Sequence, residues 1–261
     1  MSLQHFFLRD QVLADEADGE FALALDADDL KHALVLRLAA GEHIAVIDAD
    51  ADYFECEVVE CKKSGMRVRI AQHLDAPRRH VRVTLAQGLA KGTKMDEVIR
   101  HATELGVSAF IPLACERSVM KLDVKQAAKK IDRWRAIAKS AAMQSGQPEV
   151  PEVREPMKTA AFAKSLSEFD AVCVCWEEAD ATRHLADALA RVSEEARAGK
   201  DVSVAIVVGP EGGLSEGEVD ALLAAGDKAS LVSLGSSILR TETAGVVAPA
   251  LALYELGLLG G

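Results

Sequence analysis

The chain lacks several features that would each define a class of protein. Its 261 residues contain no run of 18 or more apolar residues, so no transmembrane helix is predicted. No segment fits the glycine-rich phosphate loop of nucleotide triphosphatases, which argues against a nucleotide-binding protein of that type. Residues 1–9 are few and end in a charge, so we expect no secretory signal peptide.

Cysteine is scarce and irregularly spaced. An odd number of scattered thiols does not form a disulfide framework, and we expect reduced cysteines in a cytoplasmic protein. Neither a C-x-x-C pair nor neighbouring histidines accompany them, so no metal site is predicted. The five positions are Cys56, Cys61, Cys115, Cys173 and Cys175.

Basic residues are outnumbered overall but concentrated in two segments. The net charge is -11, yet residues 61–83 hold seven Lys and Arg against one acidic residue. Residues 115–140 hold eight against three. Two basic segments on an acidic chain form either a local footprint for phosphates or a pair of solvated faces, and composition leaves both open.

Residues 1–75 are expected to form a small domain rich in β-strands. A Ser64-Gly65 turn joins two alternating strands into a hairpin, and short strands at this spacing favour a small barrel. The expected strands are 21–25, 43–47, 53–59 and 66–70, with a helix at 28–38.

Residues 78–261 alternate between strand and helix patterns. Such alternation predicts an α/β domain with a parallel sheet. The expected strands are 78–85, 107–113, 171–176, 204–208 and 231–234, and the expected helices are 95–105, 123–143, 182–197 and 244–259.

Two glycine-bearing loops follow the last two of these strands. The first is Gly209-Pro210-Glu211-Gly212-Gly213, and the second runs from Leu234 to Thr243. Glycine after a buried strand lets a ligand approach bare backbone, so we expect one small-molecule site at the carboxyl ends of adjacent parallel strands. The first loop taken alone also fits a tight turn without a ligand. Ser215 and Glu218, just beyond it, have the spacing of a helix capping box.

Four motifs together resemble a known family. They are K-G-T-K-M-D (91–96), A-T-E-L-G-V (102–107), V-G-P-E-G-G-L-S (208–215) and L-G-S-S-I-L-R-T-E-T-A (234–244). Their order is similar to that of the RsmE family, which are 16S ribosomal RNA uridine N3-methyltransferases of the SPOUT class. The segment 32–42 is similar to that family's PUA-like RNA-binding domain.

The resemblance implies a fold and an activity. It implies a SPOUT-type parallel sheet with a C-terminal trefoil knot after a PUA-like barrel, in a homodimer that binds S-adenosylmethionine between the glycine loops. The product it implies is N3-methyluridine in 16S rRNA near the decoding region, made on the assembled 30S subunit. Methylation of another RNA, or RNA binding without catalysis in ribosome assembly, stay open as alternatives.

The resemblance also implies which residues bind the cofactor. Backbone groups around the glycine loops take the adenine edge and the ribose, and Glu211 accepts from the ribose or the tail unless it only caps a turn. The expected cofactor-binding residues are Val208, Gly209, Glu211, Gly212, Leu234, Gly235, Ile238, Leu239, Arg240 and Thr243.

Two residues of the second loop are candidates for catalysis. Arg240 cannot act as a base at neutral pH, so it stabilises a developing uracil oxyanion, grips a phosphate, or pairs with Glu242. Glu242 is a candidate to accept the N3 proton, and a water molecule is an equal one.

Basic residues at loops are candidates for RNA contact: Lys91, Lys94, Arg117, Arg78 and Arg37. The sequence departs from the family at two positions implied to face RNA. His5 and Gln147 stand where the family usually has Arg, and the loss of two guanidinium groups weakens phosphate binding.

Overall fold

A computed structural model of the chain describes residues 3–16, 19–76, 78–180, 182–224 and 228–260. It divides into two compact units. The N-terminal unit comprises residues 1–78 with 142–150, and the large unit comprises 79–141 with 151–261. The boundary that we expected after residue 75 lies close to residue 78, where the chain first passes from the N-terminal unit into the large unit. The segment 142–150, which we expected in the second domain, belongs instead to the N-terminal unit, because its apolar residues join that unit's core.

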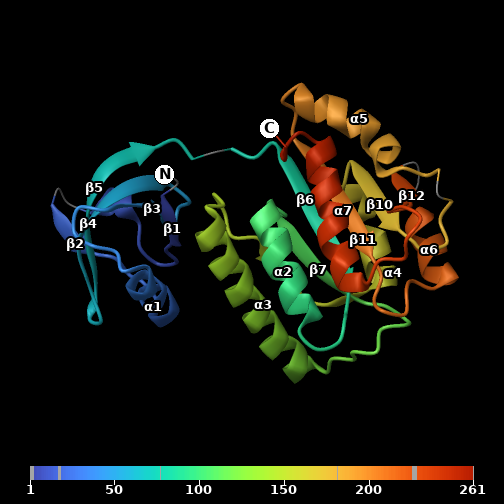
Figure 1. The fold of residues 1–261 in the computed structure, drawn as a ribbon, viewed down its shortest axis with the longest axis horizontal. Helices are drawn as coiled ribbons and strands as arrows, with labels where there is room; N and C mark the ends of the chain where they lie inside the picture. The colour runs from blue at the N-terminus through green and yellow to red at the C-terminus, as the bar shows by residue number, and fades with distance from the viewer. Residues whose placement is uncertain (1–2, 17–18, 77, 181, 225–227, 261) are drawn as a thin grey trace. The chain divides into compact units, whose positions relative to one another are not determined.

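The N-terminal unit is built on a five-stranded sheet in the order β1-β3-β4-β5-β2 (Figure 1). Its strands pair antiparallel except for β1, which pairs parallel to β3. The strands are β1 (Gln4–Phe7), β2 (Glu20–Ala22), β3 (His43–Ile47), β4 (Tyr53–Lys62) and β5 (Gly65–Leu74), with η1 (Leu13–Asp15) and α1 (Ala27–Leu36) between them. Strands β3, β4 and β5 contain the strands expected at 43–47, 53–59 and 66–70, and β2 overlaps the strand expected at 21–25. β1 adds an element that the sequence did not indicate.

Alternation along β4 explains how this sheet buries one face. Phe54, Cys56 and Val58 are buried, and the residues between them are only partly so. These side chains pack with Ala142 and Met143, which lie near the C-terminal end of helix α3 (Val124–Ser145). The period of two places every second side chain in the core, as expected for a sheet with one solvated face.

His5 is a buried residue of the N-terminal unit, not an exposed one. Its Nδ1 lies 2.9 Å from the carbonyl oxygen of Gln147, and its Nε2 lies 2.9 Å from the hydroxyl of Tyr53. Since a carbonyl can only accept, Nδ1 carries the proton and Nε2 accepts from Tyr53. The family resemblance implied an RNA-facing position here. In this chain the imidazole instead links β1 to the segment 142–150, and only 6% of the residue is exposed.

The large unit contains a parallel sheet in the order β12-β10-β11-β6-β7-β8, and β9 also pairs with β7. Every pairing in it is parallel, which confirms the predicted α/β class. The strands are β6 (Val81–Gly88), β7 (Ala109–Ala114), β8 (Glu152–Val153), β9 (Met157–Lys158), β10 (Ala171–Cys175), β11 (Val202–Val208) and β12 (Ala229–Val232).

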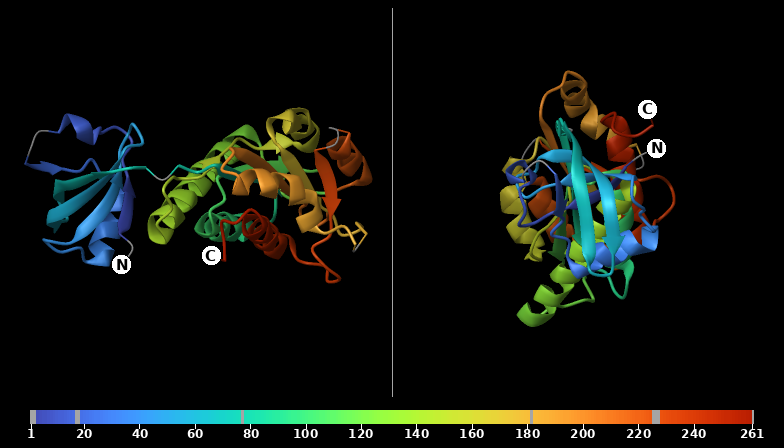
Figure 2. Two further views of the ribbon diagram at one scale, coloured as in Figure 1. Left: turned by 90° about the horizontal axis from the view of Figure 1, so that it is seen from above. Right: turned by 90° about the vertical axis from the view of Figure 1, so that its left-hand side faces the viewer.

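Helices cover both faces of this sheet (Figure 1). Helices α2 and α7 lie side by side on one face, as Figure 1 and the left view of Figure 2 show. The elements α4, η2 and α6 bury Val172, Val174, Ala205 and Val207 on the other face. The helices are α2 (Lys94–Leu105), α3 (Val124–Ser145), α4 (Thr159–Phe162), η2 (Ala163–Glu168), α5 (Leu185–Arg197), α6 (Glu216–Leu223) and α7 (Thr241–Glu255). Burial on both faces explains why the strands read as continuous apolar runs.

Asp96 fixes helix α3 against helix α2. Its Oδ2 accepts from Nε and Nη2 of Arg133 at 2.9 and 2.7 Å, and its Oδ1 accepts from the indole N–H of Trp134 at 3.1 Å. Asp96 and Trp134 are both buried. The last residue of the K-G-T-K-M-D motif is therefore a structural anchor, because it satisfies two side chains of the neighbouring helix.

Candidate active site

A pocket of about 400 Å³ opens at the carboxyl ends of β10, β11 and β12. Its walls are the residues after β10, β11 and β12, together with Lys94 of α2 and the first turn of α7. We expected the two glycine loops to follow neighbouring strands. This is corrected by the sheet order, because β10 lies between β11 and β12 and pairs with both.

The first glycine loop is held close to the end of β6. A Cβ added to Gly88 would lie 2.3 Å from the backbone nitrogen of Pro210 and 2.7 Å from the carbonyl carbon of Gly209. No side chain fits between the two backbones, so only glycine permits this approach. The capping box predicted at the next helix is present: Ser215 accepts from the N–H of Glu218, and Glu218 accepts from the N–H of Ser215.

The second glycine loop is far less enclosed. Residues 235–238 are exposed, and 85% of Ile238 is accessible to solvent. Gly235 has a φ of +117°, a conformation that other residues adopt only with strain. A reciprocal pair of hydrogen bonds between Ser233 and Gly235, each 3.3 Å long, forms the start of the loop.

The end of β10 contributes residues that the sequence did not single out. Cys175, Trp176 and Glu177 line the pocket. The indole nitrogen of Trp176 is buried and has no hydrogen-bond partner within the described residues. The carboxylate of Glu177 lies against Gly213, where an added Cβ would be 2.1 Å from Oε1. The expected strand at 171–176 was the available signal, since ligands bind beyond the carboxyl ends of parallel strands.

A buried amide joins β6, the first loop and helix α7. Nε2 of Gln87 donates to the hydroxyl of Thr241 at 2.8 Å, and that hydroxyl donates to the carbonyl of Gly209 at 2.6 Å. Gln87 is 1% exposed. This network positions the first turn of α7. We expected residues 241–243 to belong to the second loop, but they are helical.

Lys94 holds two carboxylates at the pocket wall. Its Nζ lies 3.1 Å from Glu211 and 3.3 Å from Glu242. The hydrogen bond with Glu211 raises the pKa of the Lys94 ammonium, and Glu242 adds to the effect. Burial by itself raises the pKa of the Glu211 carboxyl, but hydrogen bonds from the N–H groups of Lys91 and of Glu211 itself, together with Lys94, bring it below its ordinary value. The Glu211 carboxylate is therefore charged at neutral pH.

Arg240 lies at the rim of the pocket and is exposed. It makes no ion pair with any residue in the described part of the chain, and Glu242 pairs with Lys94 instead. The predicted alternative of an Arg240–Glu242 salt bridge is therefore wrong. A guanidinium at the mouth of a pocket retains all its donors for a ligand.

Comparison with known proteins identifies the family to which the chain belongs. The RNA methyltransferase domain family matches residues 77–253. Ribosomal RNA small subunit methyltransferase E of Bacillus subtilis (strain 168) is 33% identical over an alignment of 261 residues, and the match covers 99% of each chain. The chain belongs to this methyltransferase E family. The protein of the same name from Mycobacterium tuberculosis (strain CDC 1551 / Oshkosh) is 35% identical over 229 residues, covering 86% of this chain and 83% of its own.

A solved methyltransferase E has the same fold. The crystal structure from Neisseria gonorrhoeae, bound to S-adenosyl methionine, has a TM-score of 0.77 at 26% identity and covers 97% of each chain. The resemblance inferred from the four sequence motifs is thus confirmed at the level of the family. Family membership agrees with an α/β large unit and an N-terminal sheet that are both present here.

Most residues expected to bind a cofactor in a methyltransferase E meet at this one pocket. Those lining it are Val208, Gly209, Glu211, Leu234, Gly235, Ile238, Leu239 and Arg240. Gly212 and Thr243 do not line it. A Cβ on Gly212 would lie 3.0 Å from Arg117, and Thr243 is exposed on the first turn of α7.

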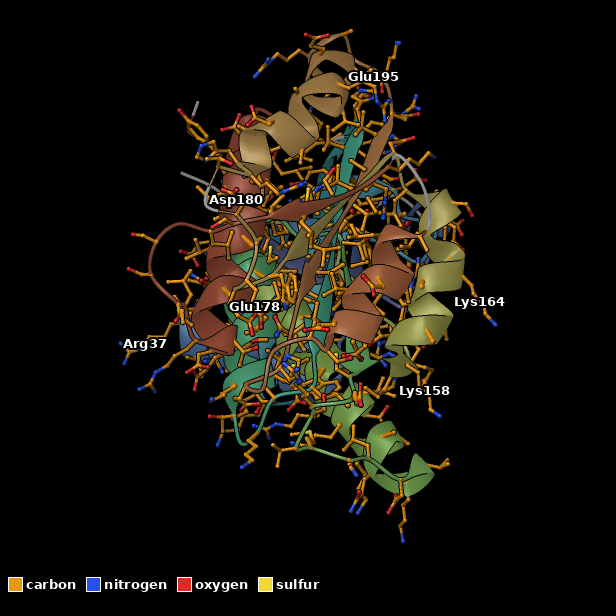
Figure 3. The ribbon with its side chains drawn as sticks, turned by 90° about the vertical axis from the view of Figure 1, so that its right-hand side faces the viewer. Arg37, Lys158, Lys164, Glu178, Asp180 and Glu195 are labelled. Atoms are coloured by element: carbon orange, nitrogen blue, oxygen red, sulfur yellow. The ribbon has the colours of Figure 1, made fainter. Side chains whose placement is uncertain are left out.

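The five basic residues expected to contact RNA fall into three groups. Lys94 forms ion pairs with the carboxylates of Glu211 and Glu242 at the pocket. Lys91 and Arg117 are exposed beside the first loop, and Nη1 of Arg117 donates to the carbonyls of Gly212 and Leu214. Arg78 and Arg37 belong to the N-terminal unit and are exposed, with Arg37 projecting outward (Figure 3).

The described residues contain neither a cluster of metal ligands nor a disulfide. Within the described residues no group of three His, Cys, Asp or Glu is placed to hold a metal ion, and no helix has the length and hydropathy to cross a membrane. All five cysteines are free. Burial raises the pKa of Cys56 and Cys173 to about 12 each, so these thiols are protonated at neutral pH.

Proposed function

We propose that this protein uses S-adenosylmethionine to methylate N3 of a uridine in 16S rRNA near the decoding region, on the assembled 30S subunit. The observation that carries the proposal is the pocket made by both glycine loops at the carboxyl ends of β10, β11 and β12. The methyltransferase E from Neisseria gonorrhoeae, bound to S-adenosyl methionine, supports the choice of cofactor. Relatives named for the ribosomal RNA small subunit support the choice of substrate.

The residues of the pocket fit this cofactor. An adenine and a ribose need bare backbone and apolar walls, and the strand end at Val208 with the loop residues Leu234, Gly235 and Leu239 provides them. Trp176, whose buried indole N–H has no hydrogen-bond partner among the described residues, lines the same pocket. A charged amino-acid tail needs both signs of charge, and the group formed by Lys94, Glu211 and Glu242 carries both.

Methylation of uracil N3 requires removal of a proton. When bound, the cofactor supplies an electrophilic methyl group on a sulfonium. Glu242 accepts the N3 proton, directly or through a water, and the ammonium of Lys94, 3.3 Å away, holds the Glu242 carboxylate in place at the pocket wall. Arg240 stabilises the negative charge that spreads onto the uracil carbonyl oxygens as the proton leaves.

RNA binding in this proposal uses both units. Lys91 and Arg117 lie beside the first glycine loop, so they hold phosphates next to the target base. The N-terminal unit acts as a PUA-like RNA-binding domain, with Arg37 and Arg78 on its exposed surface. Burial of His5 removes one expected phosphate contact, so the N-terminal unit depends on its other basic residues.

The proposal includes three features of organisation. The C-terminal residues of the large unit form the trefoil knot of the SPOUT class, and the strand order supports it. The protein acts as a homodimer, because Leu251, Tyr254 and Leu258 near the C-terminus leave 42%, 60% and 47% of their surfaces exposed. A 16S rRNA substrate supports a cytoplasmic location.

Calorimetric titration with S-adenosylmethionine tests the site. The wild type should bind one cofactor per chain, and Gly235→Trp should abolish binding because it blocks the second loop and strains a residue with φ of +117°. Methylation assays on 30S particles, read by mass spectrometry of the rRNA, then identify the nucleotide and the modified atom. Absence of cofactor binding both with and without 30S particles would favour RNA binding without catalysis.

A further inference from the structure

A second hollow lies at the start of helix α3 and takes no part in the proposed reaction. It encloses about 460 Å³, and its lining comes from residues 120–133. The half-buried side chains of Met120 and Leu122 line it, and Gln126, Lys129 and Lys130 of α3 stand around them. None of its lining residues lines the glycine-loop pocket, so the two hollows are separate.

Helix α3 is fixed so that its basic residues stay at the surface. Ile131, Trp134 and Ala138 are fully or almost fully buried along one side of the helix. Arg133 is exposed but already paired with Asp96, which also holds Trp134. The orientation of the helix is therefore set by its buried side, and the lysines next to Arg133 are not needed for it.

Three lysines that line this hollow, and Lys125 one helical turn before Lys129, have no acidic partner in the described ranges. Lys121, Lys125 and Lys129 are exposed and Lys130 is half-buried, and none of them forms a salt bridge with a residue in the described ranges. Lys125 and Lys129 are one helical turn apart, where like charges destabilise a helix. Asp123, which lies between Lys121 and Lys125, accepts from the backbone N–H of Gln126 at the helix start. Asp132, which follows Lys130 by two residues, forms no salt bridge with a residue in the described ranges. Folding alone gives no reason for this concentration of positive charge.

We propose that the hollow and Lys121, Lys125, Lys129 and Lys130 form a docking surface for the phosphate backbone of the ribosomal RNA. The inference rests on the proposed function, and charge complementarity identifies the occupant. Because the whole chain carries a net charge of -11, most of its surface repels RNA, and an unpaired basic surface determines where RNA approaches. The apolar side chains of Met120 and Leu122 suit an unstacked base in a looped RNA segment.

The position of this surface agrees with a path from the pocket. Arg117 bonds to the first glycine loop, and Met120 follows it by three residues, so their Cα atoms are at most about 10 Å apart. Two successive phosphates of an RNA strand that leaves the pocket beside Arg117 therefore reach Met120 and the lysines. The docking surface extends the contact beyond the target nucleotide and adds affinity without touching the reacting atoms.

The test is a pair of matched double variants in the full-length protein. Lys129→Ala with Lys130→Ala removes two charges from the docking surface. Lys158→Ala with Lys164→Ala removes two exposed charges from the other side of the sheet, where α4 and η2 lie (Figure 3). Binding to 30S particles is measured against salt concentration for each, alongside cofactor titration and methylation kinetics.

We expect the plot of log K against log salt to be less steep by about 1.5 for the Lys129/Lys130 variant. At roughly 0.1 M salt this difference corresponds to an affinity about 30-fold weaker. KM for 30S particles should rise while kcat and cofactor affinity stay unchanged. The Lys158/Lys164 variant should behave as the wild type, and Lys129→Arg with Lys130→Arg should restore binding.

Other outcomes separate this proposal from the proposed function. An unchanged slope in a variant that still methylates would overturn the docking surface and leave the enzyme intact. The expected loss of RNA binding without any methylation by the wild type would support the surface and overturn the enzyme. An equal loss in the Lys158/Lys164 variant, or a changed oligomeric state in the Lys129/Lys130 variant on sedimentation, would overturn the assignment to RNA.

Discussion

The two glycine loops of the pocket differ in how firmly the protein holds them. The first is pressed onto β6 at Gly88, and its Glu211 receives a hydrogen bond from the N–H of Lys91 and an ion pair from Lys94. The second is exposed from Gly235 to Ile238, and local bonds with Ser233 define only its start. One wall of the pocket is therefore formed in advance, and the other is formed by residues with few partners.

The difference between the two loops indicates how each one contributes to the free energy of ligand binding. A loop held by backbone contacts loses little entropy when a ligand arrives, so it contributes affinity through geometry. An exposed loop with an apolar side chain contributes by covering the ligand and removing apolar surface from water. We therefore expect changes in the first loop to affect folding and binding together, and changes in the second to affect binding alone.

The largest effect is expected from Gly88→Ala. The added Cβ would lie 2.3 Å from the backbone nitrogen of Pro210, and neither backbone can move without disturbing the sheet. We expect a loss of about 3 kcal/mol in the free energy of unfolding, measured by urea denaturation, with loss of cofactor binding. Gly217→Ala is the control, since its Cβ meets nothing and lies in α6, so stability should stay or rise by up to about 1 kcal/mol. Equal stability of the two variants would contradict a preformed first loop.

A smaller effect, confined to binding, is expected from Ile238→Ala. Ile238 is 85% exposed in the free chain, so its truncation should change the free energy of unfolding by less than about 0.5 kcal/mol. If the second loop covers the cofactor, the lost apolar contact should weaken cofactor affinity about tenfold by calorimetry. Val35→Ala, at a side chain 72% exposed in the N-terminal unit, should change neither quantity. Unchanged affinity in the Ile238 variant would mean that this loop stays open when the cofactor binds.

The smallest effect is expected from the pH dependence of the first loop. The pKa of Glu211 is lowered in the folded protein, so its contribution to stability is present above the ordinary carboxyl pKa. That contribution disappears as pH falls through the lowered value. Glu211→Gln should therefore flatten the acid side of the profile of Tm against pH, by about 2 °C at most because the pair is partly exposed. A profile with the same acid slope as the wild type would remove Glu211 from the preformed wall.

The sequence predicted the parts of the site that lie in continuous motifs. Both glycine loops and the capping box at Ser215 were identified from local patterns, because turn and cap preferences act over a few residues. Trp176 and Glu177 were missed, because the position of β10 between β11 and β12 depends on long-range pairing. The partner of Glu242 was also missed, since Lys94 is 148 residues away along the chain.

The fold shows the same division between local and distant information. The strand expected at 43–47 matches β3, and the helix expected at 95–105 begins one residue earlier as α2. The two-residue strands β8 and β9 carry no pattern long enough to detect, and they form only because β7 offers a free edge. The role of His5 was equally hidden, because its partners Tyr53 and Gln147 are distant in sequence.

The crossing of the chain at residues 142–150 has a practical consequence for protein engineering. A fragment that ends at residue 78 would carry the five strands of the N-terminal sheet but would lack Ala142 and Met143 from its core and the acceptor that His5 uses. The N-terminal unit is therefore not a module that a single cut releases or a simple fusion transplants. A graft onto another protein would have to supply the missing nine residues as a second, separate segment of the chain.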